Sequence, residues 1–274
     1  MLFKFMGSFI KIYKNRGIKK TLLFYINLFL SKFGYSIKSV NINTKANEVE
    51  KKVFSKCLFK YDQRGFWYLN PMPSLKDLND YYSSVYWAGR GGSVFSCEER
   101  DLRHFQILNE LIPDFFKKKR TILNFGAGHG GISHILWVLG HDIINVEPSE
   151  IPNFYNERWK QSYSIDEVEK SSVDFVYGSH SLEHVQDINL HNSKIKQIIK
   201  RDGYVFWEVP NGDHPFSGPA ENRIHVPHTY YFQKKYFEQE FDHIILNEYF
   251  NSKSGSNVIS NWKCHLGYEG DCII

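Results

Sequence analysis

"TILNFGAGHGGISHILWVLGHDIINVEPSE", residues 121–150, carries the clearest structural pattern in this chain. The apolar runs at 121–125 and 142–147 predict two buried strands, and the apolar residues of 130–139 recur at helical spacing between them. A strand, a tight turn, a helix and a second strand form the unit from which parallel α/β sheets are built. This stretch therefore predicts an α/β fold.

The turn after the first strand is rich in glycine, and an acid ends the second strand. The glycines are Gly126, Gly128, Gly130 and Gly131, and the acid is Glu147. Glycine lets the backbone turn tightly and approach a ligand, and a helix N-terminus opens directly behind the turn. A carboxylate about 20 residues after the first glycine can accept hydrogen bonds from the hydroxyls of a ribose. We therefore expect a ligand that contains adenosine.

The glycine spacing fits two classes of cofactor. Gly-x-Gly-x-x-Gly over 126–131 is the fingerprint of dinucleotide-binding enzymes. Gly-x-Gly-x-Gly over 126–130 is the loop of an S-adenosylmethionine (SAM) enzyme. Two Tyr-x-x-x-Lys pairs, which begin at Tyr230 and Tyr231, would suit a nicotinamide-dependent oxidoreductase. That pair belongs with a Gly-x-x-x-Gly-x-Gly loop, which residues 126–132 do not form.

Strands and helices alternate through the rest of the chain. Apolar runs such as VDFVYG and YVFWEV predict a parallel sheet that helices cover on both faces. The expected helices lie near 150–159 and at 188–200 and 233–240, and the expected strands lie at 173–178, 203–209, 243–250 and 257–264.

The chain divides into three expected parts. Residues 1–47 form a basic amphipathic segment, residues 48–118 a small helical and aromatic cap, and residues 119–274 the cofactor-binding domain. The cap is rich in aromatic and turn-forming residues, and a helix is expected at about 97–111. The boundary near 118 is where the alternating strands and helices begin.

The N-terminal segment differs from the rest in charge. The net charge of the chain is +4. Residues 1–46 contain nine lysines and arginines and no acidic residue, so the rest of the chain has a net negative charge. Leu22, Ile26 and Phe29 recur at helical spacing, but the apolar run is too short to span a bilayer. Residues 1–40 are expected to contact an anionic membrane surface or a partner enzyme, or to pack on the body.

Cysteine usage and charge narrow the class of protein further. The cysteines are far apart and form no Cys-x-x-Cys pair, which is typical of a reducing, cytoplasmic compartment and of a chain without a zinc knuckle. Nucleic-acid binding would require basic residues across a folded surface, which the acidic body argues against. We expect a cytoplasmic protein that the basic segment could bring to the inner membrane face. The cysteines are Cys57, Cys97, Cys264 and Cys272.

Residues 173–211 read VDFVYGSHSLEHVQDINLHNSKIKQIIKRDGYVFWEVPN. Together with ILNFGAGHGG and NVEPS, this stretch resembles the class I SAM-dependent methyltransferases. The closer resemblance is to the branch with His-x-Leu-Glu-His after the fourth strand, which modifies sugars and surface glycans in bacteria. It covers residues 121–241. The expected fold is then a Rossmann-like, seven-stranded, mostly parallel sheet with a C-terminal antiparallel strand pair.

The resemblance also implies roles for individual residues. The segment LNPMPSLKDLNDYYSSVYW is similar to one that leads into the fold of sugar methyltransferases and could close over the cofactor. Some relatives carry a zinc-binding cysteine cluster before it; here Cys57 stands alone, so no metal is expected. The implied cofactor-binding residues are Gly126, Ala127, Gly128 and Gly130 at the methionine part, Glu147 at the ribose, Pro148 and Asp166 at the adenine, Gly178, Ser179 and His180 near the methyl group, and Tyr82 and Tyr86 in the closing segment.

One residue departs from the family pattern. The family usually has an acid where this chain has Asn124, and that acid helps to fix the ammonium group of the cofactor. The carbonyl oxygen of Asn124 can still accept a hydrogen bond. Without the charge, the contact is weaker by about 1 kcal/mol.

Histidines are the candidate catalytic residues. Methylation of a hydroxyl requires a base, and an imidazole titrates near neutral pH. Relatives often carry a histidine just before the aromatic pair that here is Tyr230 and Tyr231. The expected catalytic residues are therefore His225 or His228, with His180 at the end of a strand. Glu183 and His184 are either catalytic or cap the following helix.

The acceptor is the least determined part of the function. The resemblance implies O-methylation of a sugar, nucleotide-sugar or other precursor of a bacterial capsular glycan. Three alternatives stay open. The protein could methylate a nitrogen or carbon atom of another small molecule or of a phosphoramidate group, it could be an NAD-dependent oxidoreductase, or it could be a binding module without catalytic activity. Candidate acceptor-binding residues are the aromatic Trp67, Tyr81, Trp87 and Phe216 and the arginines Arg64, Arg90 and Arg223.

Overall fold

The fold is described from a computed structural model. It describes residues 48–82, 94–148, 160–210, 212, 228–240, 244–251 and 260–268, of which 94–99, 244–251 and 260–268 are described by their backbone alone. The basic segment 1–47, the expected helix near 150–159, Tyr86 and His225 lie outside the described residues.

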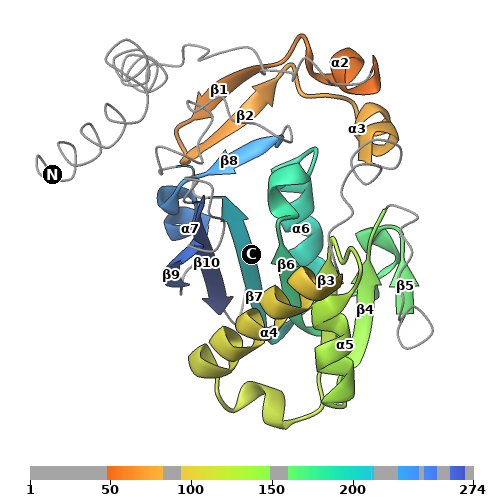
Figure 1. The fold of residues 1–274 in the computed structure, drawn as a ribbon, viewed down its shortest axis with the longest axis vertical. Helices are drawn as coiled ribbons and strands as arrows, with labels where there is room; N and C mark the ends of the chain where they lie inside the picture. The colour runs from red at the N-terminus through yellow and green to blue at the C-terminus, as the bar shows by residue number, and fades with distance from the viewer. Residues whose placement is uncertain are drawn as a thin grey trace, which may run out of the picture.

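The centre of the main sheet consists of five strands: β3 (Thr121–Phe125), β4 (Asp142–Val146), β5 (Lys160–Ser162), β6 (Val173–Ser179) and β7 (Ile199–Pro210). Their order across the sheet is β5-β4-β3-β6-β7, and all neighbouring pairs are parallel (Figure 1). The predicted α/β class with a parallel sheet is confirmed. Strand β5 was not expected from the sequence, where its short, polar stretch carries no strand pattern.

Two C-terminal strands extend the sheet at the edge formed by β7. Strand β10 (Ser260–Tyr268) pairs antiparallel with β7, and β9 (Ile244–Asn251) pairs antiparallel with β10 on the outside. Both follow the helix α7 (Lys234–Glu240). The full order is therefore β5-β4-β3-β6-β7-β10-β9.

The two faces of the sheet bury alternate residues of each strand. Ile122 and Phe175 face one core cluster, which also contains residues of α4 (Val94–Leu111) and α5 (Gly131–Val138). Leu123 and Val176 face the other cluster, with residues of α6 (Ile188–Ile198) and α7. Because successive side chains of a strand point to opposite faces, this alternation places helices on both sides of the sheet.

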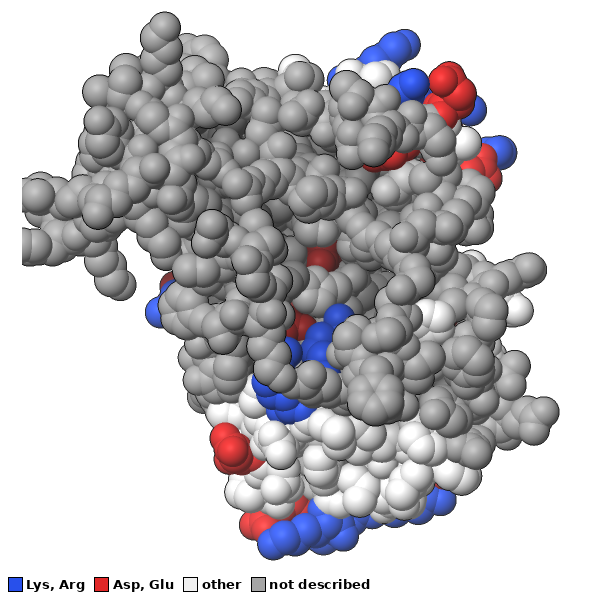
Figure 2. Space-filling view, viewed as in Figure 1, with Lys and Arg blue, Asp and Glu red and all other residues white. Residues whose placement is uncertain are grey.

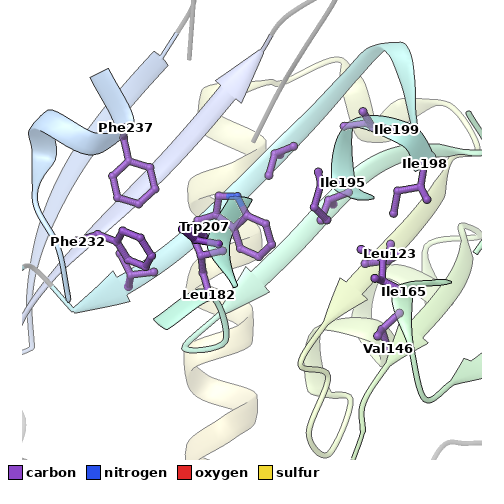
Figure 3. Packing of buried hydrophobic residues seen from close by; sticks show 14 of the residues in the cluster. Leu123, Val146, Ile165, Leu182, Ile195, Ile198, Ile199, Trp207, Phe232 and Phe237 are labelled. Carbon is purple, nitrogen blue, oxygen red and sulfur yellow. The ribbon is translucent and has the colours of Figure 1, made fainter. Parts of the chain in front are cut away.

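The second cluster is built around large side chains. Figure 3 shows Trp207 beside Leu182, with Phe232 and Phe237 at one end of the cluster. Trp207 and Phe237 are fully buried, and their removal from water contributes roughly 1.5 to 3 kcal/mol for each large side chain. Gly178 leaves the space for Trp207, because a Cβ on Gly178 would collide with the indole ring.

The cap contains a small antiparallel sheet that the sequence did not predict. The sheet consists of β1 (Leu58–Asp62), β2 (Phe66–Asn70) and the distant β8 (Tyr230–Phe232). The cap also contains the helices α2 (Glu48–Phe54) and α3 (Leu75–Tyr81). The strand order is β1-β2-β8, so a segment beyond the main parallel strands completes the cap sheet (Figure 1). Strand β8 joins the two regions, because Tyr231 packs in the cap core while Phe232 packs in the main core.

Helix α4 lies within the range that the sequence assigns to the cap, but Leu108 packs in the core beneath the main sheet. Three short 3-10 helices complete the described elements: η2 (Phe115–Lys117), η4 (Ile165–Glu167) and η5 (Leu182–His184). Among the residues that the structure describes, no helix is both long and apolar enough to cross a membrane.

Candidate active site

A cavity of about 780 Å³ lies at the carboxyl ends of the parallel strands. Open α/β sheets bind their ligands at this edge. The cavity lining includes three groups of residues: 126–131 with Glu147, 179–181, and Tyr82 with His184 and His228. Figure 2 shows a hollow in one face of the molecule, with acidic atoms visible inside it.

The glycine loop has a backbone conformation that suits ligand binding. Gly126, Gly128 and Gly130 have φ angles of 68°, 52° and 76°, which lie in the left-handed region. Gly130 is also the N-cap of α5, so the helix N-terminus opens on the loop. At Gly126 a Cβ would lie 2.5 Å from the Cβ of Ser181, so other side chains would displace this neighbour.

Glu147 supports the same loop. The Gly128 N–H donates a hydrogen bond to Glu147 Oε2 over 3.0 Å, and Glu147 is buried. Ala127 and Pro148 line the cavity next to it. This combination of left-handed glycines, a helix N-terminus and a buried carboxylate fits the amino-acid and ribose parts of SAM.

Asn124 lies in a buried polar network beneath the loop. Its amide nitrogen donates to Ser133 Oγ over 2.9 Å, and Ser133 Oγ donates to Asn145 Oδ1 over 2.6 Å. The amide oxygen of Asn124 is the atom of this side chain that can accept a hydrogen bond. Asp101 of α4 is buried, lines the cavity and lies against Gly131. No sequence pattern indicated a role for Asp101, because α4 reaches the loop only through tertiary packing.

Two of the expected cofactor residues lie outside the set of cavity-lining residues. The exposed Asp166 accepts a hydrogen bond from Lys194 Nζ over 2.6 Å, and its neighbours Ser164 and Ile165 line the cavity in its place. Gly178 packs against Trp207 instead. Ser179 and His180, by contrast, both line the cavity.

His180 lies between two buried carboxylates. Its Nδ1 is 3.2 Å from Glu183 Oε1, and its Nε2 is 3.7 Å from Glu208 Oε2. His180 also has a φ of 55°, an uncommon conformation for a residue other than glycine. The end of β6 therefore directs this imidazole to a defined position in the cavity wall.

Both carboxylate oxygens of Glu208 contact polar side chains. Ser179 Oγ donates to Oε2 over 2.6 Å, and His104 Nε2 lies 3.0 Å from Oε1. The other nitrogen of His104 lies 2.6 Å from the hydroxyl of Tyr177. Burial alone would raise the pKa of Glu208, but the contacts with His104, and then those with His180 and Ser179, hold that pKa well below its ordinary value.

Glu183 and His184 lie on η5, next to the segment that carries His228. Thr229 holds the two segments together, because its N–H and its hydroxyl donate to the Glu183 carbonyl over 2.9 and 2.8 Å. The hydroxyl of Tyr82 lies 2.8 Å from His184 Nδ1, and the His184 and His228 rings are 4.9 Å apart.

The same cluster sets the charge state of Glu183. Burial alone would raise its pKa, but the hydrogen bond from His180 and the charges of His184, His180 and His228 together lower it below the ordinary value. Glu183 therefore stays ionised although its side chain is fully buried.

The Tyr-x-x-x-Lys pairs do not form a catalytic unit. The hydroxyl of Tyr230 lies 3.3 Å from the Gln186 carbonyl, whereas Lys234 pairs with Glu238 over 3.0 Å. Burial raises the pKa of Tyr230 to about 12. The Lys235 ammonium donates to the Gln63 carbonyl. None of these four side chains lines the cavity.

Some expected acceptor-binding residues have other roles. Trp67 and Tyr81 are buried in the cap core and do not line the cavity, because the antiparallel sheet and α3 enclose them. Arg64 pairs with Asp62 and contacts Asn189. Trp87, Phe216, Arg90 and Arg223 lie outside the described residues. The aromatic side chains that line the cavity include Tyr82 and Tyr163.

Solved methyltransferase structures resemble this chain at low sequence identity. The 1,6-didemethyltoxoflavin-N1-methyltransferase of Burkholderia thailandensis, solved with 1,6-didemethyltoxoflavin and S-adenosylhomocysteine, is 15% identical over 79% of this chain and 97% of its own, with a TM-score of 0.55. A SAM-dependent methyltransferase of Archaeoglobus fulgidus is 16% identical over 72% of this chain and 100% of its own, with a TM-score of 0.48. Among curated proteins, none matches the chain significantly in sequence.

Comparison with protein families is more specific. The sequence model of the methyltransferase domain matches residues 98–254, a range that contains the glycine loop, Glu147 and the histidines around Glu183. The cavity at the carboxyl ends of the strands fits the cofactor of this family. The chain therefore belongs to the methyltransferase-domain family, and it is a SAM-dependent methyltransferase.

Proposed function

We propose that the protein methylates a hydroxyl group of a small carbohydrate or nucleotide-activated precursor of a bacterial surface glycan, such as a capsule. The observation that carries the proposal is that His180, supported by two carboxylates, lies in the same cavity as the glycine loop. The carbohydrate acceptor rests on the resemblance of the HSLEH segment and of residues 69–87 to sugar methyltransferases.

At one end of the cavity the chain binds the cofactor. The loop 126–131 would hold the methionine part, and Glu147 would accept hydrogen bonds from the ribose. Asn124 can accept a hydrogen bond from the ammonium group, and the nearby carboxylate of Asp101 would supply the negative charge that Asn124 lacks. Positions 163–165 and Pro148 would surround the adenine.

In the same cavity, His180 would act as the base. When bound, SAM supplies a methyl group on a positively charged sulfur, which leaves as a neutral thioether. The acceptor hydroxyl must lose its proton as its oxygen bonds to the methyl carbon. Glu208 and Glu183 flank the imidazole and would stabilise the imidazolium that results. His228, which also lines the cavity, is a second candidate base, and His225 stays a prediction.

The remaining proposals concern the surroundings of the enzyme. Tyr82 on the cap lines the cavity and contacts His184, so the cap would close one side of the acceptor site. The expected Tyr86 would belong to the same closing segment. The basic residues 1–40 would bring a cytoplasmic enzyme to a membrane surface or to a partner enzyme of glycan assembly.

Two measurements test this function. Calorimetric titration should show binding of S-adenosylhomocysteine and none of NADH. Incubation with SAM and a panel of nucleotide sugars, followed by mass spectrometry, should then show the mass of one added methyl group on a sugar hydroxyl. Transfer only to amine acceptors, or binding of NADH instead of the homocysteine nucleoside, would contradict the proposal.

A further inference from the structure

Glu183, His184 and His228 form a cluster of potential metal ligands, a capacity on which the proposed function does not draw. Each side chain offers one ligand atom, and these atoms all lie within 4.8 Å of one another. Glu183 is fully buried, whereas His184 and His228 line the cavity. Two imidazoles and one carboxylate are a common ligand set for divalent transition metals.

The carboxylate has one oxygen available for such a role. Glu183 Oε1 lies 3.2 Å from His180 Nδ1, but Oε2 is buried and has no hydrogen-bond partner among the described residues. A buried carboxylate oxygen without a partner is energetically costly. A bound cation would satisfy it.

The histidine geometry agrees with metal binding. His184 Nδ1 is occupied by the Tyr82 hydroxyl, and its Nε2 lies 4.0 Å from Glu183 Oε1. Metal-binding histidines usually have their second nitrogen held by a hydrogen bond in this way. Thr229 joins the segment of His228 to the Glu183 carbonyl, so the cluster is held together by the fold.

We propose that Glu183, His184 and His228 bind a divalent transition-metal ion at the cavity wall, where the ion orients and polarises the acceptor hydroxyl. This site departs from the sequence-based expectation of no metal, and its role in catalysis rests on the proposed O-methylation. Three protein ligands leave positions open for an acceptor oxygen. An acceptor hydroxyl bound to the ion would lose its proton to His180 more readily. Its oxygen would then form the bond to the methyl carbon as the carbon–sulfur bond of SAM breaks. The oxidation state of the ion would not change.

Metal binding is tested on the full-length protein after dialysis against a chelator. Titration with Zn²⁺ and with Mn²⁺ should show one strong site per chain for at least one of them. Mg²⁺ should bind more weakly, because it prefers oxygen ligands. His184→Asn and His228→Asn should each weaken binding at least roughly tenfold. His134→Asn is the matched control, because His134 lies on α5 outside the cavity lining and should leave the site intact.

Thermal unfolding and S-adenosylhomocysteine binding of the same variants show whether they are folded. The proposal is overturned if the wild type binds neither Zn²⁺ nor Mn²⁺, or if both cavity variants bind like the wild type. Chelation that abolishes methyl transfer while homocysteine-nucleoside binding persists supports the catalytic role. Full activity after complete metal removal overturns that role but leaves the proposed O-methylation standing. Specific metal binding without any hydroxyl methylation contradicts the proposed function alone.

Discussion

Glu208 and Glu183 are two buried carboxylates on either side of one histidine, yet their surroundings differ. Both oxygens of Glu208 contact polar groups, Ser179 on one side and His104 on the other. Glu183 has one oxygen near His180 and a second without a hydrogen-bond partner in the described part of the chain. Glu208 is therefore held in a fixed position by its neighbours, which suits a structural role. Glu183 retains one oxygen that could bind a ligand such as a metal ion.

The largest expected effect comes from removing the histidine between them. His180→Asn should lower kcat by roughly 10²- to 10⁴-fold, because a positioned general base contributes about this much. Asparagine is chosen since it tolerates the left-handed backbone at this position. Affinity for S-adenosylhomocysteine, measured by calorimetry, should stay within about twofold. A loss of kcat only in His225→Asn or His228→Asn would assign the base to one of those residues.

Substitution of the two carboxylates should separate their roles. Glu208→Gln should lower the free energy of unfolding by about 3 kcal/mol, because it removes a buried carboxylate from a network and leaves His104 and Ser179 without that partner. Glu183→Gln should cost less stability, since one of its oxygens has no partner to lose. Urea denaturation of both variants measures the difference, and equal losses would contradict the comparison.

The pH dependence of Glu208 follows from the direction of its pKa shift. Its pKa in the folded state lies below the ordinary value of 4.5, so its contribution to stability is present above that pH and is lost as the pH falls below it. The stability difference between the wild type and Glu208→Gln should therefore shrink below about pH 4.5. Urea denaturation across this range measures it.

A third buried carboxylate tests the cofactor end of the cavity. Glu147→Ala should weaken S-adenosylhomocysteine binding about 30-fold, or about 2 kcal/mol, through loss of a charge-assisted hydrogen bond. Asp166→Asn is the matched control, because Asp166 pairs with Lys194 and lies outside the set of cavity-lining residues. A larger loss of binding in Asp166→Asn than in Glu147→Ala would reverse the assignment.

The smallest expected effect concerns a buried histidine that has no carboxylate at its ring among the described residues. His191 lies between Phe125 and Trp207, and burial, with a smaller effect from the charge of Lys194, lowers its pKa to about 3. The unfolded chain takes up a proton near pH 6.5 whereas the folded chain does not, so this residue costs stability as the pH falls. The cost between about pH 7 and 5.5 is about 1 kcal/mol.

His191→Phe should remove this part of the pH dependence while preserving the ring contacts. Urea denaturation at the two pH values measures it. If the variant and the wild type lose the same stability between about pH 7 and 5.5, His191 takes up its proton in the folded protein as well, contrary to the effect expected of its apolar surroundings.

Features that depend on neighbouring residues could be predicted from the sequence. Strand β3 has its predicted bounds, and α5 and β4 differ from the prediction by at most one residue at an end, because apolar periodicity and glycine placement act over short distances. The loop 126–131 and Glu147 could be predicted together, since the carboxyl ends of adjacent parallel strands necessarily meet at one edge of the sheet.

Contacts between residues that lie far apart in the sequence could be identified only from the tertiary structure. Pairing of β8 with β2 joins segments that lie far apart in the sequence, and Tyr230–Phe232 reads equally well as the start of a helix. His104 and Asp101 reach the site through the packing of α4, whose sequence carries no catalytic motif. The contrast between Glu208 and Glu183 likewise depends on side chains from separate elements. Local patterns of apolar residues and glycines determine the helices and strands. Burial and the packing of distant segments determine which side chains contact each charged group.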